Sequence, residues 1–256
     1  MIEIPTRLSH VALEILRLGK SGNDYESFVS ASILKPLGSG TNHSDRMRVF
    51  ESLLHEGCLR IEEGKFFSDT GHVPSWLIDG VADGFVDAEE VANELLDSPD
   101  QRKKFDAEIL AQIGLKGEQA FVRALREQLP ASVIINHVSL FDDTRGYDVE
   151  ITFPGLRKLC FEVKTTSRNS RHFEFFLSRN EAKVASGLGE SWLLGLVQIK
   201  EGVPSVLGTS PSDAFLSRLP QDVSEDVRWA SISCSLEFTG LQPLEASLMA
   251  ALTQES

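Results

Sequence analysis

Three residues of this chain have the types and the spacing needed for metal-assisted hydrolysis, namely Asp148, Glu162 and Lys164. Glu162 and Lys164 lie two positions apart in an apolar run, so on a strand they share one face. Two carboxylates supply the hard oxygen ligands that Mg²⁺ or Mn²⁺ prefers. A neighbouring ammonium can hold or deprotonate an attacking water. The alternative is a salt bridge of Lys164 with either acid, which by itself contributes little stability.

The elements that must position these side chains are two short strands. Apolar-rich runs at Tyr147 to Phe153 and Leu159 to Val163 flank a Pro154-Gly155 turn, which predicts a hairpin or a close strand pair. Asp148 would lie on the first strand. The alternation places Phe161 and Val163 in the core and the charged side chains on the opposite face.

A helix is predicted before this strand pair, and strands and a further helix are predicted after it. Apolar residues recur at helical spacing at Phe105, Ile109, Ile113, Phe121, Leu125 and Leu129, with Gly117-Glu118 between them. His172 to Leu177 and Trp192 to Ile199 read as strands, and the second is apolar enough for the centre of a sheet. Ser178 and Glu181 form a capping box for a helix between these two strands. This role of Glu181 is favoured here over that of a further metal ligand.

This order of features resembles the PD-(D/E)xK nuclease superfamily, and within it the DUF3883 type of domain. The resemblance covers roughly residues 105 to 200 and rests on Gly117-Glu118, Gly146-Tyr147-Asp148 and Glu162-Val163-Lys164 in the right order. Tyr147 stands where the pattern often has proline, which leaves the acid in place.

The resemblance implies an α/β fold for residues 105–256, a restriction-endonuclease-like mixed sheet flanked by helices. Asp148, Glu162, Glu118 and the backbone carbonyl of Val163 would hold Mg²⁺ or Mn²⁺, and Lys164 would orient or activate the water that attacks phosphorus. The expected activity is that of a metal-dependent DNA endonuclease. The expected context is prokaryotic antiviral defence or restriction, with an ATPase or helicase protein as partner.

The net charge of −13 is the main objection to a nucleic-acid substrate, because proteins that bind nucleic acids usually have a basic surface. Most of the acidic excess is N-terminal: residues 1–100 carry 8 Lys and Arg against 18 Asp and Glu, whereas residues 101–256 carry 17 against 20. Four basic residues follow the proposed site and are expected to line the path of the phosphate backbone. They are Arg168, Arg171, Arg179 and Lys183.

Residues 1–72 predict three short helices followed by a hairpin at Leu59 to Phe67, with a Glu63-Gly64 turn. The third helix is expected to be capped at Ser44-Asp45. This order resembles a winged helix, whose third helix and wing would contact DNA. Acidic residues in both elements favour a second interpretation, a small mostly helical domain that docks on a protein partner.

Residues 73–104 are expected to form an acidic helical connector. Between Val73 and Asp100 there is no Lys or Arg, while apolar residues still recur at helical spacing. Part of this segment is interpreted as an amphipathic helix that ends near Ser98-Pro99.

The remaining composition favours a cytoplasmic protein. Three widely spaced cysteines fit neither a disulfide framework nor a zinc site, and Cys160 is expected to be a buried inert thiol. No apolar run reaches the length of a membrane span and no leader is evident. The sequence leaves open whether the protein forms a homo-oligomer. It also does not indicate where residues 202–256 lie in the fold.

Two other classes remain open beside the nuclease. In the first, the same fold and the N-terminal domain bind DNA or a protein without cutting it, and the charged cluster is an ion-pair network. In the second, a winged-helix regulator carries an inert C-terminal domain, so residues 1–72 alone would retain DNA affinity.

The expected DNA path leads to a test. Neutralising two of Arg168, Arg171, Arg179 and Lys183 should weaken DNA binding without changing the fold. Each lost phosphate contact lowers the slope of log K against log salt by about one unit. Binding titrations across a salt series measure this slope. An unchanged slope would show that these side chains serve only to keep the protein in solution.

Overall fold

The computed structural model describes residues 4–34, 41–155, 157–167, 172–219 and 229–253. The chain divides into two compact units. Unit 1 consists of Met1–Gln112 with Lys200–Val203, and unit 2 consists of Ile113–Ile199 with Pro204–Ser256. Both helices and strands are present in each, so the predicted α/β class is confirmed at this level. Among the described residues, no helix is long and apolar enough to cross a membrane.

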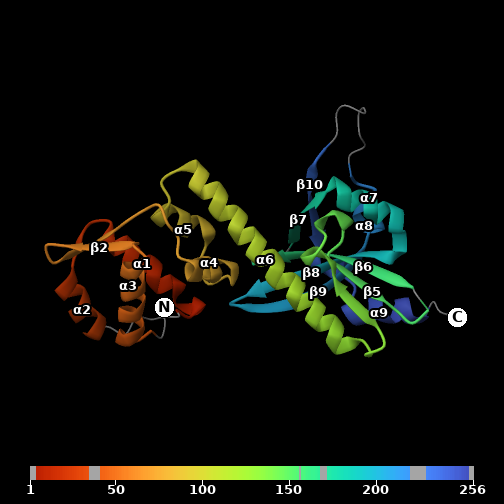
Figure 1. Cartoon of the computed structure of the whole chain (residues 1–256), viewed down its shortest axis with the longest axis horizontal. Coiled ribbons are helices and arrows are strands. Elements are labelled where there is room, and N and C mark those ends of the chain that lie inside the picture. The colour runs from red at the N-terminus through yellow and green to blue at the C-terminus, as the bar shows by residue number, and fades with distance from the viewer. Residues whose placement is uncertain (1–3, 35–40, 156, 168–171, 220–228, 254–256) are drawn as a thin grey trace. The chain divides into compact units, whose positions relative to one another are not determined.

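Unit 1 combines helices with a three-stranded antiparallel sheet in the order β1-β3-β2 (Figure 1). Its elements are η1 (Thr6–Leu8), α1 (Ser9–Gly19), β1 (Asn23–Asp24), α2 (Tyr25–Leu34), α3 (His43–His55), β2 (Leu59–Glu62), β3 (Lys65–Ser68), α4 (Ser75–Ala82) and α5 (Ala88–Leu95). The three helices and the hairpin predicted for residues 1–72 are therefore confirmed as elements.

Local sequence explains the hairpin of unit 1 and corrects the start of α3. Glu63 and Gly64 both have positive φ, 50° and 76°, as a two-residue hairpin turn requires. The cap of α3 is Asn42, whose side chain accepts a hydrogen bond from the Asp45 N–H. The prediction of Ser44-Asp45 as the cap is wrong, because the cap lies two residues before Ser44 and the helix begins at His43.

Residues 73–104, predicted as an acidic connector, form α4, α5 and the start of α6 (Pro99–Gln128), all within unit 1. The predicted amphipathic helix is present as α5, and a second helix, α4, precedes it. The two are separate because Gly84 follows α4 with φ of 76° and the Asp87 side chain caps α5. Val91 and Leu95 are fully buried. The acids of this segment are therefore mainly the solvated side of helices that belong to a core.

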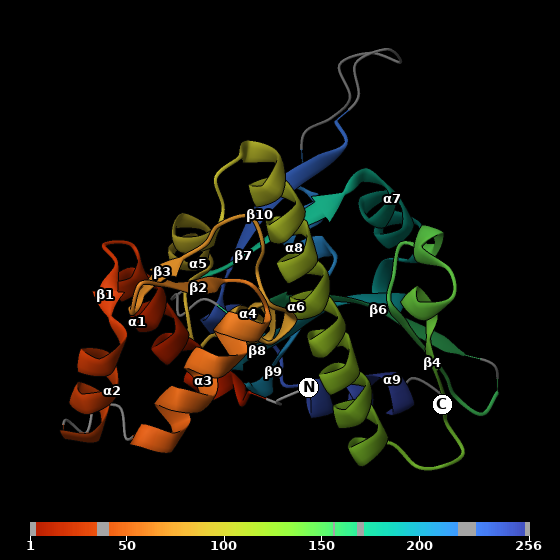
Figure 2. The same cartoon turned by 60° about the vertical axis from the view of Figure 1, so that its left-hand side comes forward.

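Unit 2 contains the second half of α6 and the remaining elements (Figures 1 and 2). These are β4 (Ile134–His137), η2 (Val138–Leu140), η3 (Asp143–Arg145), β5 (Val149–Thr152), β6 (Lys158–Thr166), β7 (His172–Ser178), α7 (Arg179–Leu188), η4 (Gly189–Ser191), β8 (Trp192–Lys200), β9 (Val203–Pro211), α8 (Asp213–Leu216), β10 (Ser231–Glu237), η5 (Phe238–Gly240) and α9 (Leu244–Thr253).

The central feature of unit 2 is a five-stranded mixed sheet with the order β4-β5-β6-β8-β9. β4, β5 and β6 are antiparallel to one another, while β6 and β8 are parallel. β6 is thus the middle strand, and the predicted interior position of β8 is confirmed. β7 leaves this sheet and pairs antiparallel with β10.

The two faces of the sheet have separate cores. One face packs against α6 and α9 and includes Phe121, Phe161 and Leu248. The other face packs against β7, β10, α7 and α8, and its core includes Trp192 and Phe173. Phe161 and Val163 lie on the first face, so Glu162 and Lys164 are directed toward the second.

Glycine allows α6 to lie close to the sheet. A Cβ atom at Gly117 would lie 1.7 Å from Thr165 Oγ1, and one at Gly195 would lie 2.6 Å from the Phe121 ring. Phe121 is fully buried and contacts the Phe161 ring at a centroid distance of 5.1 Å. Neither Gly117 on α6 nor Gly195 on β8 can therefore accept a larger residue unless the side chain opposite it moves.

The Gly195 contact predicts a large effect of a single methyl group. Gly195→Ala should lower the free energy of unfolding by about 1–3 kcal/mol, because the ring of Phe121 must move in a packed core. Urea denaturation measures the change. Gly187→Ala is the matched control: Gly187 lies in α7 with nothing within 4 Å of the added atom, so the same change should stabilise by up to about 1 kcal/mol. Equal stability of the two variants would contradict this packing.

Candidate active site

Asp148 immediately precedes β5 and is held against β6 by two hydrogen bonds. Its backbone N–H donates to Phe161 O over 2.8 Å. Its carboxylate Oδ2 accepts from the Val163 N–H over 2.7 Å. The predicted role of Val163 is that of its carbonyl oxygen, whereas its contact with Asp148 is made by its N–H. The Asp148 carboxylate is thereby brought to the strand that carries Glu162 and Lys164.

Glu162 and Lys164 form a buried ion pair on the same face of β6. Lys164 Nζ lies 2.7 Å from Glu162 Oε1, and the Glu162 side chain is 6 % exposed. Lys164 also lies 3.1 Å from Glu181 Oε2. The ammonium therefore bridges two carboxylates, one from the sheet and one from α7.

Glu181 has two roles, of which the sequence indicated one. The capping box is confirmed, since the Ser178 side chain accepts from the Glu181 N–H and the Glu181 carboxylate accepts from the Ser178 N–H. The same carboxylate oxygen contacts Lys164. Glu181 is therefore part of the charged cluster, which its capping pattern alone did not indicate.

Glu118 lies on α6 and is tied to the other end of the cluster. Its Oε2 is 2.7 Å from His137 Nε2 and accepts a hydrogen bond of 2.5 Å from Ser139 Oγ. The Glu118 charge also acts on Asp148. His137 and Ser139 were not recognised in the sequence, where neither has the spacing of a ligand pair. Their contact exists only because β4 and η2 lie beside α6.

The electrostatics of the cluster are dominated by an excess of buried carboxylates. Burial, followed by repulsion from Glu118, raises the pKa of Asp148 from 3.8 to about 7. Burial also raises the pKa of Glu162 well above its usual value, although Lys164 opposes it. For Lys164, burial alone would lower the pKa, but attraction to Glu162 and Glu181 raises it. The lysine remains charged, and one ammonium does not neutralise the surrounding acids.

The donor chemistry fits a divalent cation that needs few protein ligands. Mg²⁺ is typically held by one or two carboxylates and keeps several waters. Asp148 and Glu162 meet this requirement, since Asp148 is hydrogen-bonded to β6, the strand that carries Glu162. Across the described residues, no group of three or more His, Cys, Asp and Glu side chains is arranged to hold a metal ion. Any ion here would therefore depend on waters or on substrate oxygens to complete its coordination.

The four basic residues expected on the DNA path are only partly described. Arg168 and Arg171 lie outside the described residues. Arg179 and Lys183 lie four positions apart on α7, the helix that also carries Glu181, and are therefore on one face of it. The structure thus places two of the four on an element of the cluster.

The buried cysteines have no features of nucleophiles. Burial raises the pKa of Cys58 to about 12 and that of Cys160 to about 11. A thiolate is the reactive form, and burial disfavours it at both residues. The expected burial of Cys160 is confirmed.

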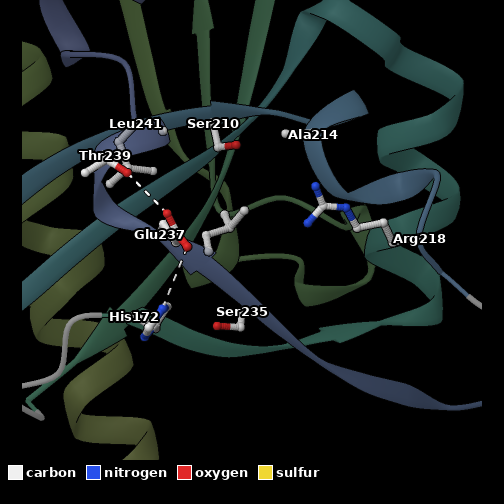
Figure 3. Close-up of a pocket in the computed structure, with 10 residues that line it drawn as sticks. His172, Ser210, Ala214, Arg218, Ser235, Glu237, Thr239 and Leu241 are labelled. Carbon is white, nitrogen blue, oxygen red and sulfur yellow. Dashed lines mark hydrogen bonds and ion pairs between the residues drawn. The ribbon is translucent and has the colours of Figure 1, made fainter.

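A polar cavity of about 490 Å³ lies elsewhere in unit 2, at the ends of β7, β9 and β10 (Figure 3). His172 and Thr239 both contact Glu237 on one side, and Arg218 extends from the other side. The cavity is lined by His172, Ser210, Ala214, Arg218, Ser235, Leu236, Glu237, Thr239, Gly240 and Leu241. These residues are distinct from the charged cluster.

Comparison with known proteins gives one match. The family model described as "Protein NO VEIN, C-terminal" matches residues 117–207, less than half of the chain. No curated protein and no solved structure matches the sequence. The matched segment begins in α6 and ends in β9, and it includes Glu118, Asp148, Glu162, Lys164 and Glu181. The part of the chain that is similar to this family is therefore the part that forms the charged cluster.

The raised pKa of Asp148 predicts a pH-dependent effect of its removal. Because the folded-state pKa, about 7, exceeds the unfolded value near 3.8, the folded protein binds more protons between these values and loses stability as the pH rises through them. Asp148→Asn removes this loss. It should therefore stabilise the protein at pH 8 and have little effect near pH 4. The pKa shift of Asp148 limits this stabilisation to about a few kcal/mol.

Glu150→Gln provides a control of opposite sign. Burial would raise the pKa of Glu150, but hydrogen bonds from Lys158 and Tyr147 lower it, so this carboxylate stabilises the protein at pH 8. Its replacement should destabilise there. Chemical denaturation at pH 4 and pH 8 measures both variants. If Asp148→Asn were less stable than the parent protein at pH 8, the account of this carboxylate would be incorrect.

Proposed function

We propose that the chain is a metal-dependent endonuclease that hydrolyses DNA phosphodiester bonds. The observation that carries the proposal is the convergence of Asp148, Glu162 and Lys164 in one partly buried cluster with more acid than base. A purely structural ion pair would be expected to balance its charges, because uncompensated buried carboxylates cost stability. A site that binds cations explains why such a cost is retained.

Each residue has a distinct role in this proposal. Asp148 and Glu162 would hold Mg²⁺ or Mn²⁺, which when bound neutralises charge on the substrate phosphate and acidifies water. Lys164 orients the attacking water with its ammonium, which is fixed between Glu162 and Glu181. Glu118 positions the neighbouring loop through Ser139 and adds negative charge near Asp148.

The finer fold assignments belong to the same proposal. Unit 2 would have the restriction-endonuclease-like fold, which the middle strand β6 and the helix α6 on one face support. Residues 1–72 would be a winged-helix-like domain that binds DNA or a protein, supported by three helices and the β2-β3 hairpin. The biological setting would be cytoplasmic prokaryotic defence or restriction with an ATPase or helicase partner, a setting inferred from resemblance.

A second candidate is a module with the same fold that binds DNA or a partner without cutting. The observation that favours it is the engagement of Lys164 in two ion pairs, at 2.7 and 3.1 Å, which an ion-pair network would also show. The two candidates differ in whether the cluster needs a cation and whether Lys164 is needed for cleavage.

Metal titration distinguishes the candidates. Mg²⁺ or Mn²⁺ at about 100 times its Kd should stabilise the folded protein by about 2.7 kcal/mol, which raises Tm by several degrees. Asp148→Asn should lose this response because a ligand is removed. Lys164→Ala should keep the response but lose cleavage of plasmid DNA, because its role concerns the water and not the ion.

Lys158→Ala is the matched control for Lys164→Ala. Lys158 also pairs with a carboxylate on this sheet face, Glu150 at 3.0 Å, but outside the cluster. This variant should keep both the metal response and cleavage. If Lys164→Ala cleaved DNA at the rate of an active parent protein, the catalytic role of the lysine would be refuted and the ion-pair network would take its place.

A further inference from the structure

The polar cavity at the ends of β7, β9 and β10 has opposite charges on its two walls (Figure 3). Arg218 supplies a guanidinium on one wall, and Glu237 supplies a carboxylate on the other. The volume of about 490 Å³ lies within the range of small-molecule sites, about 300–1,000 Å³. The cavity therefore has the size and the polarity to bind a small ligand that carries different groups at its two ends.

The wall that carries Arg218 is fixed by the core of unit 2. Arg218 follows α8 by two residues, and its N–H donates to Phe215 O over 3.0 Å. Phe215 is buried, and its ring contacts the rings of Phe175 and Trp192, each at a centroid distance of 6.0 Å. The backbone from which the guanidinium extends is thus held by packed aromatic side chains.

The polar groups of this wall are available to a ligand. The guanidinium of Arg218 is directed into the cavity and forms no ion pair with any described residue (Figure 3). Ser210 also lines the cavity and is only 2 % exposed. Its hydroxyl donates to Pro211 O over 3.4 Å, which is long for a hydroxyl donor. An oxyanion suits these groups, because a guanidinium matches two oxygens of a phosphate.

Glu237 is held on the opposite wall by two side chains. Thr239 Oγ1 donates to Glu237 Oε2 over 3.4 Å, and His172 Nε2 lies 4.0 Å from Glu237 Oε1. His172 and Glu237 are also partners in the β7–β10 ladder. The Glu237 side chain is 73 % exposed, so its oxygens can accept hydrogen bonds from a ligand. A carboxylate in such a position is the group that binds ribose hydroxyls in dinucleotide-binding folds.

The frame of the cavity is closed by contacts between β9 and the segment after η5. The Thr209 N–H donates to Gln242 O over 2.8 Å, and the Gln242 N–H donates to Thr209 O over 2.9 Å. Thr209 Oγ1 also lies 2.6 Å from Ser247 Oγ on α9. Leu236 and Leu241 add apolar surface to the lining. A site whose walls are already fixed loses little conformational entropy when it binds a ligand.

We propose that this cavity binds a ribonucleotide, with its phosphate at Arg218 and its ribose hydroxyls at Glu237. The carboxylate repels an anion and accepts from hydroxyl groups, so the two charges set the orientation of the ligand. The apolar surface of Leu236 and Leu241 can contact the base. A ligand that consisted of phosphate alone would leave Glu237 without a partner group. The inference does not depend on the proposed nuclease activity, since none of these residues belongs to the charged cluster.

The test measures the Kd of AMP for the full-length protein by isothermal titration calorimetry. EDTA is present so that no metal ion recruits the nucleotide to the charged cluster. AMP is compared with 2′-deoxy-AMP, which lacks one ribose hydroxyl, and with inorganic phosphate, which lacks the ribose. AMP should bind at least about tenfold more tightly than either, because a hydrogen bond to a charged group contributes about that factor.

Variants of the two walls should have different effects. Arg218→Ala should weaken AMP binding by about tenfold or more, because the phosphate loses charge-assisted hydrogen bonds. Glu237→Gln should remove most of the preference for AMP over 2′-deoxy-AMP, because a neutral amide is a weaker acceptor than a carboxylate. Arg145→Ala is the matched control for Arg218→Ala: Arg145 is 56 % exposed and pairs with Asp142 outside the cavity. It should bind AMP like the parent.

Three outcomes would overturn the proposal. If the parent protein binds no AMP at millimolar concentration, the site is refuted, whereas plasmid cleavage with Mn²⁺ tests the proposed nuclease separately. If AMP binds no more tightly than 2′-deoxy-AMP or inorganic phosphate, recognition of the ribose is refuted. If Arg218→Ala binds AMP like the parent while Asp148→Asn does not, the nucleotide lies at the charged cluster and not in the cavity.

Discussion

Unit 2 depends on one constraint: a buried ammonium lies among more carboxylates than its single charge can neutralise. Lys164 is held between Glu162 and Glu181, and Asp148 and Glu118 add further negative charge. Carboxylates that were free in water would move apart because they repel one another. Here the strands β5 and β6, the cap of α7 and the position of α6 each fix one member, so the repulsion persists in the folded state. The surrounding core supplies the stability that this arrangement requires.

The local part of this arrangement could be predicted from sequence. Alternation along β6 is enough to place Phe161 and Val163 in one core and Glu162 and Lys164 on the other face. The three N-terminal helices and the β2-β3 hairpin also follow from apolar spacing and turn residues. These features involve residues close together in the chain, whose geometry the backbone itself determines.

The remaining part depends on distant contacts that no local pattern encodes. The capping box predicted the start of α7 correctly, but the contact between Glu181 and Lys164 depends on how α7 packs on the sheet. The contact of Glu118 with His137 and Ser139 likewise joins a helix to a strand and a turn. Between Val73 and Asp100, the sequence indicated an amphipathic helix but not the break before it, where Gly84 ends α4 and Asp87 caps α5.

The pairing of β7 with β10 and the packing of α9 concern how the protein is made. β10 and α9 come from the last residues that the structure describes, yet one completes the ribbon over the Trp192 core and the other covers the Leu248 side of the sheet. During synthesis on the ribosome, the parts of the two sheet faces that β10 and α9 cover therefore remain exposed until these elements have emerged. A nascent chain that already contains every residue of the charged cluster would still expose apolar surface on both faces, and so would be a natural substrate for chaperones.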